Sequence, residues 1–316
     1  MNANSTLYWS SLFAYENCPQ QFLWLIGWGM INVGGGPGHP KPPPIKESLH
    51  HPVMGKVVQA TVEKLYNDEM WRDPKNLSTS LLEFVDREWF RQVKRNHIDY
   101  HKARITADEM VNVCREGVLG YIQTMKAHRL LGPYARAEVD LIGWIDKWNP
   151  VGGRTDLIIR REDTGVMILD GKNSRYKEGN PDQLRWYALL FRLAYREMPA
   201  RIGFVWYRFP YGAPAFDKAG APLLDEGGNP TIEQGVEWVS FTEEDLRGLA
   251  LRATDAKKAM RKEIFPANPV PSYCKYCVFE SVCGARQEQR KANAEKRGHK
   301  PLEEIDEPGG FSDFSL

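Results

Sequence analysis

An acidic residue and a lysine lie two positions apart at the end of an apolar run. Asp170, Gly171 and Lys172 follow the apolar residues 166–169. In a strand, side chains at positions i and i+2 project from the same face, about 6.6 Å apart. Asp170 and Lys172 are therefore expected on one side of a sheet. An isolated Asp-x-Lys pair is more often a salt bridge at the end of a strand, so a functional interpretation requires further residues.

A second carboxylate precedes the Asp-x-Lys pair in the sequence. Asp156 precedes Asp170 by fourteen positions, near the start of the preceding expected strand. If the two strands are adjacent, two carboxylates meet, and they repel each other unless a cation lies between them. Oxygen ligands from carboxylates, a backbone carbonyl and water suit Mg²⁺ or Mn²⁺. A lysine beside such an ion can position or deprotonate water and stabilise charge on a phosphoryl oxygen, so the predicted chemistry is phosphodiester hydrolysis.

Cysteines form a second candidate site. Cys274, Cys277 and Cys283 make a compact C-x2-C-x5-C clip near the end of the sequence, and Cys18 is the natural fourth thiolate. Four thiolates hold either Zn²⁺ or an iron-sulfur cluster, and the ligand set alone does not distinguish them. Cys114 lies on an apolar helical stripe and is most simply a buried core residue.

The elements that must position these residues alternate between sheet and helix. Runs of β-branched and aromatic residues between turns predict strands, and apolar residues at three- to four-residue spacing predict helices. The expected strands span 137–147, 155–161, 166–172, 201–209 and 236–241, and the first three form an antiparallel meander. The expected helices span 10–24 with a break at Cys18-Pro19, 53–69, 80–103, 107–131, 181–197 and 245–263. The fold class is therefore α/β.

Glycine- and proline-rich segments punctuate these elements. Residues 34–44 predict a loop or lid, residues 149–153 predict the turn between the first two strands, and residues 211–235 form an insertion. The polar residues beyond 285 predict a mobile tail.

The composition indicates a globular protein without a global attraction to polyanions. The 316 residues carry 42 Lys and Arg against 41 Asp and Glu, so any nucleic-acid site must come from local clustering. The expected helices at 87–104 and 247–262 carry such clusters of positive charge. No run of about 18 apolar residues occurs and the N-terminus lacks the features of a signal peptide, so we expect a cytoplasmic protein without membrane contact.

Three short motifs together resemble those of the RecB-like exonucleases in the PD-(D/E)XK nuclease superfamily. The motifs are Gly153-x-x-Asp156, Asp170-x-Lys172 and Gln183-x-x-x-Tyr187. The resemblance implies a restriction-endonuclease-like core, in which helices flank a central mixed sheet. It also implies that Asp156, Asp170 and the Gly171 carbonyl bind Mg²⁺ or Mn²⁺, that Lys172 is the catalytic lysine, and that Gln183 and Tyr187 reach the active site or DNA.

One position departs from this family pattern. RecB-like nucleases usually carry a histidine ligand in a Gly-x-x-x-His setting, but here Gly55 is followed at that spacing by Gln59. Gln59 could bind the metal through its amide oxygen, or His50 or His51 could replace the missing histidine. Glu138 and Asp146 are further acidic candidates. We prefer Asp156 to Asp146 because its spacing to Asp170 fits a hairpin.

The cysteine pattern adds a second resemblance. Cys18 and the distal clip are similar to the cysteines of iron-sulfur RecB-like nucleases, including the CRISPR-associated adaptation nucleases and the AddB nuclease domain. The resemblance implies a structural 4Fe4S cluster, with Zn²⁺ as the alternative. The implied segments are an N-terminal segment at 1–28, a helical cap at 29–135, a nuclease core at 136–264, the iron-sulfur clip at 265–285 and a tail at 286–316.

The expected activity is metal-dependent hydrolysis of DNA by an exonuclease, on single strands or duplex ends. Proteins of recombination, replication or CRISPR adaptation are the partners that the resemblance suggests. The alternative is a catalytically weak or inactive module of the same fold that binds DNA or acts as a scaffold, and Gln59 is the feature that favours it.

Overall fold

A six-stranded mixed sheet forms the centre of the computed structural model, which describes residues 5–27, 50–96, 98, 100–174, 176–217, 220–274, 277 and 279–296. The strand order is β1-β3-β4-β5-β6, and β2 pairs with β3 from Pro150 to Ile159, on the edge opposite β1 and β4. The strands are β1 (Leu7–Tyr8), β2 (Ala135–Trp144), β3 (Pro150–Arg161), β4 (Gly165–Lys172), β5 (Arg201–Trp206) and β6 (Val236–Val239). β1 runs parallel to β3 and β4 parallel to β5, whereas the other pairs are antiparallel.

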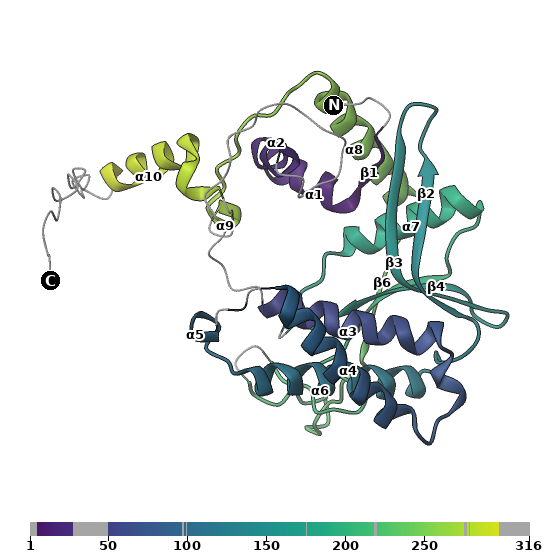
Figure 1. The fold of residues 1–316 in the computed structure, drawn as a ribbon. Coiled ribbons are helices and arrows are strands. Elements are labelled where there is room, and N and C mark those ends of the chain that lie inside the picture. The colour runs from purple at the N-terminus through teal and green to yellow at the C-terminus, as the bar shows by residue number, and fades with distance from the viewer. Residues whose placement is uncertain are drawn as a thin grey trace, which may run out of the picture.

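Three helices cover one face of the sheet: α3 (His50–Asn67), α4 (Leu77–Arg95) and α6 (Ala107–Ala127). They lie below the sheet in Figure 1. A capping box starts α6, in which the Thr106 side chain accepts from the backbone of Glu109 and the Glu109 side chain accepts from that of Thr106. The apolar faces of these helices form one buried cluster with Leu157, Met167 and other sheet residues. The short helices η1 (Met70–Arg72) and α5 (Tyr100–Ala103) lie between them in sequence.

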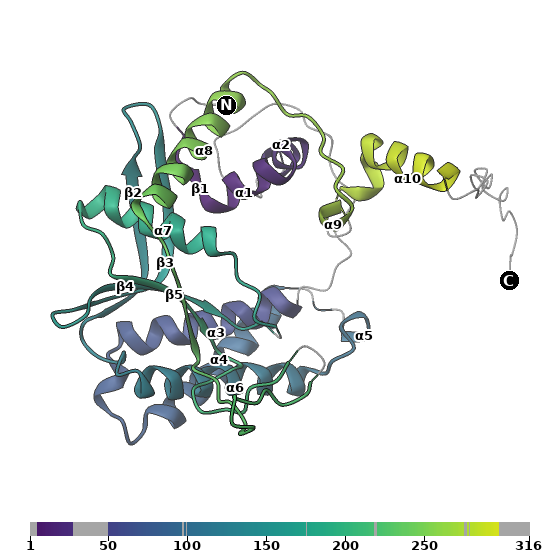
Figure 2. The same ribbon diagram turned by 180° about the vertical axis from the view of Figure 1, so that it is seen from behind.

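Four helices cover the other face, as the reverse view in Figure 2 shows: α1 (Trp9–Asn17), α2 (Pro19–Gly27), α7 (Pro181–Tyr195) and α8 (Glu243–Arg261). Pro181 occupies the first turn of α7, where its missing N–H group costs no hydrogen bond. The second buried cluster joins these helices to sheet residues such as Ile158, Ile168 and Phe204. The predicted α/β class with a central mixed sheet between helices is therefore confirmed.

Two of the differences between predicted and observed elements concern β3 and α4. Residues 150–153 were expected in a turn but belong to β3, because the turn lies earlier: the Ile145 N–H donates to the Asn149 carbonyl at 3.1 Å. Space for side chains is limited at Gly153, where an added Cβ would lie 2.9 Å from Leu190. The helix expected at 80–103 is divided, since α4 ends at Arg95 and α5 follows.

The C-terminal part is more helical than the sequence predicts. After α8 come α9 (Pro271–Cys274), η2 (Glu280–Val282) and α10 (Gly284–Lys296), which extends away from the sheet in Figure 1. Good helix-forming residues explain α10 in place of a tail at 286–296, although none of its residues is buried. The loop or lid predicted at 34–44 and residues 297–316 lie outside the described residues. The division of the chain into five segments stays a prediction. No described helix has the length and apolar character needed to cross a membrane.

A buried lysine holds the N-terminal segment against the sheet. The Lys257 ammonium on α8 donates to the Ser5 carbonyl at 3.0 Å and to the Pro150 carbonyl at 3.3 Å. Burial, with the nearby Arg261 charge, lowers the pKa of Lys257 to about 8. This side chain therefore connects α8 to the chain before β1 and to the start of β3.

We expect the stability of the wild-type protein relative to Lys257→Met to rise between about pH 8 and pH 10.5. The folded protein binds fewer protons than the unfolded chain in this window, because the lysine pKa is lower in the folded state. The difference in the free energy of unfolding between wild type and variant is expected to grow by about 1–3 kcal/mol across this window. Urea unfolding at several pH values measures it. A difference that is constant with pH would contradict the prediction.

Candidate active site

The candidate carboxylates lie where two strands separate. Pairing of β3 with β4 ends at Leu157 and Leu169, whereas β4 continues beside β5 to Lys172. The Gly171 N–H beyond this point donates to Asp156 Oδ2 at 2.8 Å. The divergence of the strands therefore makes room for the Asp156 carboxylate next to the Asp-x-Lys motif.

A glutamine on α7 connects the other candidate residues. Lys172 Nζ lies 2.5 Å from Asp170 Oδ2 and donates to Gln183 Oε1 at 3.1 Å. Gln183 Nε2 lies 3.3 Å from Asp170 Oδ1 and 3.2 Å from the Tyr187 hydroxyl, and it donates to both. The Asn180 side chain caps this end of α7 by accepting from the Asp182 N–H, and so positions Gln183 in the first turn. The side chains of Asp170, Lys172, Gln183 and Tyr187 thus form one connected group, and Asp156 joins it through the Gly171 N–H.

Burial makes the two aspartates difficult to ionise. It raises the pKa of Asp156 well above its usual range, and the neighbouring Asp170 carboxylate raises it further. Burial also raises the pKa of Asp170, although Lys172 opposes this shift. Among the described residues, Asp170 Oδ2 is a buried oxygen without a hydrogen bond of good geometry. Two buried carboxylates with one lysine between them are the features that a bound cation would compensate.

Gln59 lies close to an additional acidic residue. Its amide nitrogen donates to Glu138 Oε1 at 2.8 Å, and Arg154 approaches the same carboxylate to 4.0 Å. Glu138 has a left-handed backbone conformation, with φ at 53°. Its two neighbours in β2 pair with Leu157 and Thr155 of β3, so Glu138 itself lies opposite Asp156. Burial raises the pKa of Glu138. The sequence identified Glu138 only as a further candidate, because the fold alone brings it opposite Asp156.

The remaining candidates lie elsewhere. Asp146 is in the turn between β2 and β3, where it accepts from the Trp148 N–H at 2.8 Å and from Asn149 at 2.6 Å. His50 and His51 begin α3, and the burial of His51, with the charges of His50 and Arg208, lowers its pKa. No group of three or more His, Cys, Asp and Glu side chains in the described part of the chain has an arrangement that could hold a metal ion. A metal would therefore need backbone, amide or water ligands besides Asp156 and Asp170.

A comparison with protein families agrees with this arrangement. The model of the PD-(D/E)XK nuclease superfamily matches residues 9–284. The chain belongs to the PD-(D/E)XK nuclease superfamily. No curated protein matches the sequence. Among solved structures, this nuclease is similar to "Crystal structure of SSO0001", with 15% identity, a TM-score of 0.32, and coverage of 75% of this chain and 97% of that chain.

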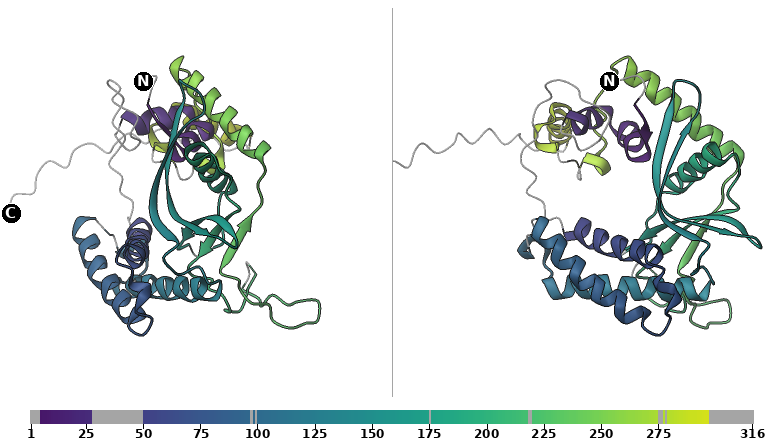
Figure 3. Two further views of the ribbon diagram at one scale, coloured as in Figure 1. Left: turned by 90° about the vertical axis from the view of Figure 1, so that its right-hand side faces the viewer. Right: turned by 45° about the vertical axis from the view of Figure 1, so that its right-hand side comes forward.

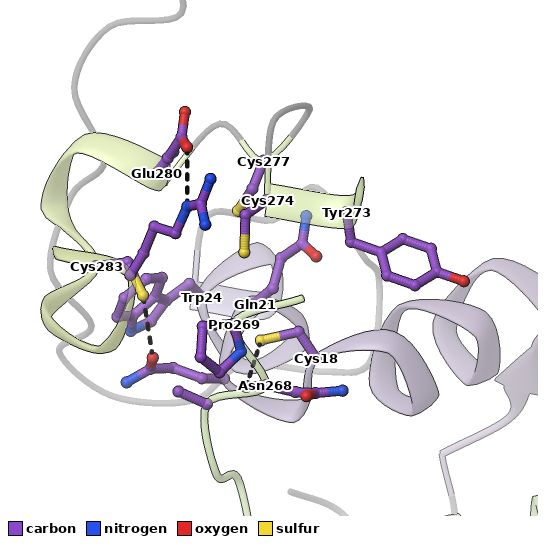
Figure 4. Close-up of a pocket in the computed structure, with 13 residues that line it drawn as sticks. Cys18, Gln21, Trp24, Asn268, Pro269, Tyr273, Cys274, Cys277, Glu280 and Cys283 are labelled. Carbon is purple, nitrogen blue, oxygen red and sulfur yellow. Dashed lines mark hydrogen bonds and ion pairs between the residues drawn. The ribbon is translucent and has the colours of Figure 1, made fainter. Parts of the chain in front are cut away.

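The four predicted cluster cysteines of this nuclease lie around one pocket, which Figure 4 shows. Cys18 precedes α2, Cys274 ends α9, and Cys277 and Cys283 follow it. The Asn268 N–H donates to Cys18 Sγ at 3.5 Å. Burial raises the pKa of Cys277 to about 11, and the three other thiols contribute to this shift. The fold therefore brings the two ends of the described chain together at the thiols.

The fifth cysteine is separate from this pocket. Cys114 is completely buried in the cluster that α3, α4 and α6 form with the sheet, and burial raises its pKa to about 12. Its thiol contacts the Met54 carbonyl at 3.8 Å. The interpretation of Cys114 as a core residue agrees with this position.

Part of the positive charge on α8 of the nuclease is used within the protein. Arg252 contacts Glu16 at 2.7 Å and Asp182 at 2.6 Å, and so connects α1, α7 and α8. Arg261 donates to the Trp148 carbonyl at 3.0 Å, and Lys257 is buried. The helix predicted to contact a nucleic-acid backbone at 247–262 thus has part of its positive charge paired within the protein, while Arg247 and Lys262 stay exposed.

Proposed function

We propose that this nuclease is a Mg²⁺- or Mn²⁺-dependent deoxyribonuclease that acts as an exonuclease on single-stranded DNA or duplex ends. The observation that carries the proposal is the convergence of Asp156, Asp170 and Lys172 at the point where β3 leaves β4. Two carboxylates beside a lysine are suited to phosphodiester hydrolysis, because they can hold a cation near a group that handles the attacking water.

Asp156, Asp170 and the Gly171 carbonyl would hold the metal ion. Their fit to a hard cation is supported by the burial of both carboxylates, which raises the pKa of each aspartate. The bound ion would supply a Lewis acid that lowers the pKa of water and offsets phosphate charge. The Gln59 amide nitrogen is already used by Glu138, so only the Gln59 oxygen is free to act as a ligand, and His50 and His51 remain the alternatives.

Lys172 would position the attacking water and stabilise the charge that develops on the phosphate. Its ammonium is fixed from two sides by Asp170 and Gln183, so little reorganisation is needed during the reaction. The Tyr187 hydroxyl accepts from Gln183 Nε2 and so orients the amide that holds the lysine. Gln183 and Tyr187 are therefore proposed to act through Lys172 as well as toward DNA.

A digestion assay tests this proposal. Labelled linear DNA with free ends, the same DNA with blocked ends, and circular DNA are incubated with Mg²⁺ or Mn²⁺. An exonuclease degrades only the substrate with free ends, and EDTA stops the reaction. Absence of cleavage with either metal would favour the alternative of an inactive DNA-binding or scaffolding module, to which the glutamine at position 59 already points.

We also propose that Cys18, Cys274, Cys277 and Cys283 bind a structural 4Fe4S cluster. Their gathering around one pocket supports the proposal, since thiolates are the usual ligands of such clusters. The thiols as they stand lack metal-binding geometry, so loading would draw them closer together. Zn²⁺ remains the alternative occupant.

Cys277→Ser is expected to abolish the broad visible absorbance near 400 nm of protein purified without oxygen and to lower the unfolding temperature. The reason is that Cys277 is one of the four proposed ligands, so its loss removes a ligand from a link between distant segments. Cys114→Ser is the control, and it should keep the absorbance. A colourless wild-type protein that contains one zinc ion per chain would exclude the cluster.

A further inference from the structure

Strands β2 and β3 extend beyond the rest of the sheet as an arm, and β1 lies beside them (Figure 3). The register places Tyr8 of β1 and Ile142 of β2 opposite Gly152 of β3, on either side of it. Trp144 lies opposite Pro150, two positions further along the arm. Paired residues share a face of the sheet, and so do residues two positions apart. Tyr8, Ile142 and Trp144 therefore belong to one face.

The opposite face of the arm is buried. Leu7, Leu141 and Val151 point into the cluster that contains α7 and α8. Where an antiparallel sheet packs on one side only, the outward positions are expected to be polar. Here Tyr8, Ile142 and Trp144 are 41%, 59% and 54% exposed. Three large apolar side chains thus occupy outward positions without being covered by the described residues.

Gly152 allows the segment before α1 to pack directly on β3. An added Cβ at Gly152 would lie 2.8 Å from Thr6 Cγ2 and 3.4 Å from Tyr8 Cε1. The tyrosine ring consequently lies close to the backbone of the glycine. Thr6 and the Tyr8 ring therefore cover the glycine, and the exposed parts of Tyr8 and Ile142, on either side of β3, are apolar surface on which a planar ring can stack.

Arg154 links this region to the proposed catalytic site. It is the next outward residue of β3 after Gly152, and Asp156 follows two positions later. Its guanidinium contacts Asp140 at 2.8 Å and Glu138 at 4.0 Å, while 58% of its side chain remains exposed. A guanidinium binds phosphate through paired hydrogen bonds. Both paired hydrogen bonds of Arg154 go to Asp140, so a phosphate would take the place of Asp140 at the guanidinium. The exposed apolar residues are thus continuous with a cation that can exchange its partner beside the carboxylates.

We propose that the outward face of the arm, formed by Tyr8, Ile142, Trp144 and Arg154, binds the unpaired strand of the nucleic acid that enters the active site. This proposal rests on the proposed nuclease function. Exposed aromatic side chains stack on unpaired bases, and Arg154 contacts the backbone. A nucleic acid is favoured over a protein partner because the face leads along β3 directly to the residues proposed to cut phosphodiester bonds.

The test measures binding of a labelled single-stranded oligonucleotide to the full chain in EDTA by fluorescence anisotropy. Trp144→Ala is expected to raise the Kd about tenfold, because each base stacked on an aromatic ring contributes strongly to binding. Arg154→Ala is expected to raise the Kd and to reduce its dependence on salt. Leu251→Ala is the matched control, since Leu251 is an exposed apolar residue on α8, and its Kd should equal that of the wild type.

An unchanged Kd for Trp144→Ala, with circular dichroism like that of the wild type, would overturn the proposal. If Trp144→Ala converted a dimer into a monomer and left DNA binding unchanged, the proposal would also be overturned, because the face would then join two copies of the chain. Wild-type protein that binds single strands through Trp144 but cleaves no DNA with Mg²⁺ or Mn²⁺ would refute the nuclease function and support the arm face. If cleavage requires Lys172 but DNA binding does not depend on Trp144, the proposed role of the arm face is refuted and the nuclease function is not.

Discussion

Lys172→Ala is expected to lower the rate of metal-dependent DNA cleavage by about a thousandfold. The lysine ammonium is the cation closest to the Asp170 carboxylate, and Gln183 holds it from the other side. Its removal leaves neither a group to position the attacking water nor a charge to stabilise the phosphate. Asp170→Ala should have a similar effect, because it removes both a proposed metal ligand and the partner of Lys172. Single-turnover cleavage at saturating protein measures both changes.

The control for this prediction is Lys258→Ala. Lys258 lies on the surface of α8 in an exposed ion pair with Asp255, and such pairs contribute little to stability. This variant should cleave at the wild-type rate. Binding of DNA to Lys172→Ala should remain detectable, and its circular dichroism should match the wild type. Full activity of either Lys172→Ala or Asp170→Ala would rule out the proposed mechanism.

Asp156→Asn is expected to stabilise the metal-free protein at neutral and alkaline pH, although it abolishes cleavage. The folded pKa of Asp156 lies above its unfolded value because of burial and the Asp170 charge. The stability associated with the protonated form is therefore present below about pH 4 and is lost as the pH rises through the folded pKa. Asparagine is neutral at every pH and can still accept from the Gly171 N–H. We expect a gain of about 2–4 kcal/mol in the free energy of unfolding at about pH 8.

Urea unfolding in EDTA at about pH 3.5 and pH 8 measures this gain. The difference between variant and wild type should disappear at the lower pH, where the wild-type carboxyl is neutral as well. Asp146→Asn serves as the control, because hydrogen bonds from the Trp148 N–H and Asn149 lower the pKa of this exposed carboxylate. It should not stabilise the protein at either pH. Loss of stability in Asp156→Asn at pH 8 would show that the carboxylate charge is compensated within the metal-free fold.

Catalysis and the stability of the metal-free protein place opposite demands on this site. A site that holds a divalent cation between buried carboxylates is unfavourable when the cation is absent, since each charge is then poorly solvated. Addition of Mg²⁺ should therefore stabilise the wild type and leave Asp156→Asn unchanged. The same reasoning explains why the most destabilising acidic residues are also the ones proposed to act in catalysis.

Local sequence determined the parts of the protein that depend on neighbours in the chain. The i, i+2 spacing of Asp170 and Lys172 was sufficient to predict that both meet, because a strand has only two faces. The i, i+4 spacing likewise predicted that Gln183 and Tyr187 share a face of α7, and they are hydrogen-bonded. The break at Cys18-Pro19 and the alternation of strands with helices were predicted for the same reason.

Only the tertiary structure decided which distant groups meet. The Asp156 carboxylate accepts from the Gly171 N–H because β3 leaves β4 at that point, and no local pattern encodes where two strands separate. Glu138 meets Gln59 through the packing of α3 against β2, and Arg252 of α8 is paired with Glu16 of α1 and Asp182 of α7. Side-chain periodicity specifies the direction in which a residue points along its own element. The partner that it finds depends on the packing of elements distant in the chain.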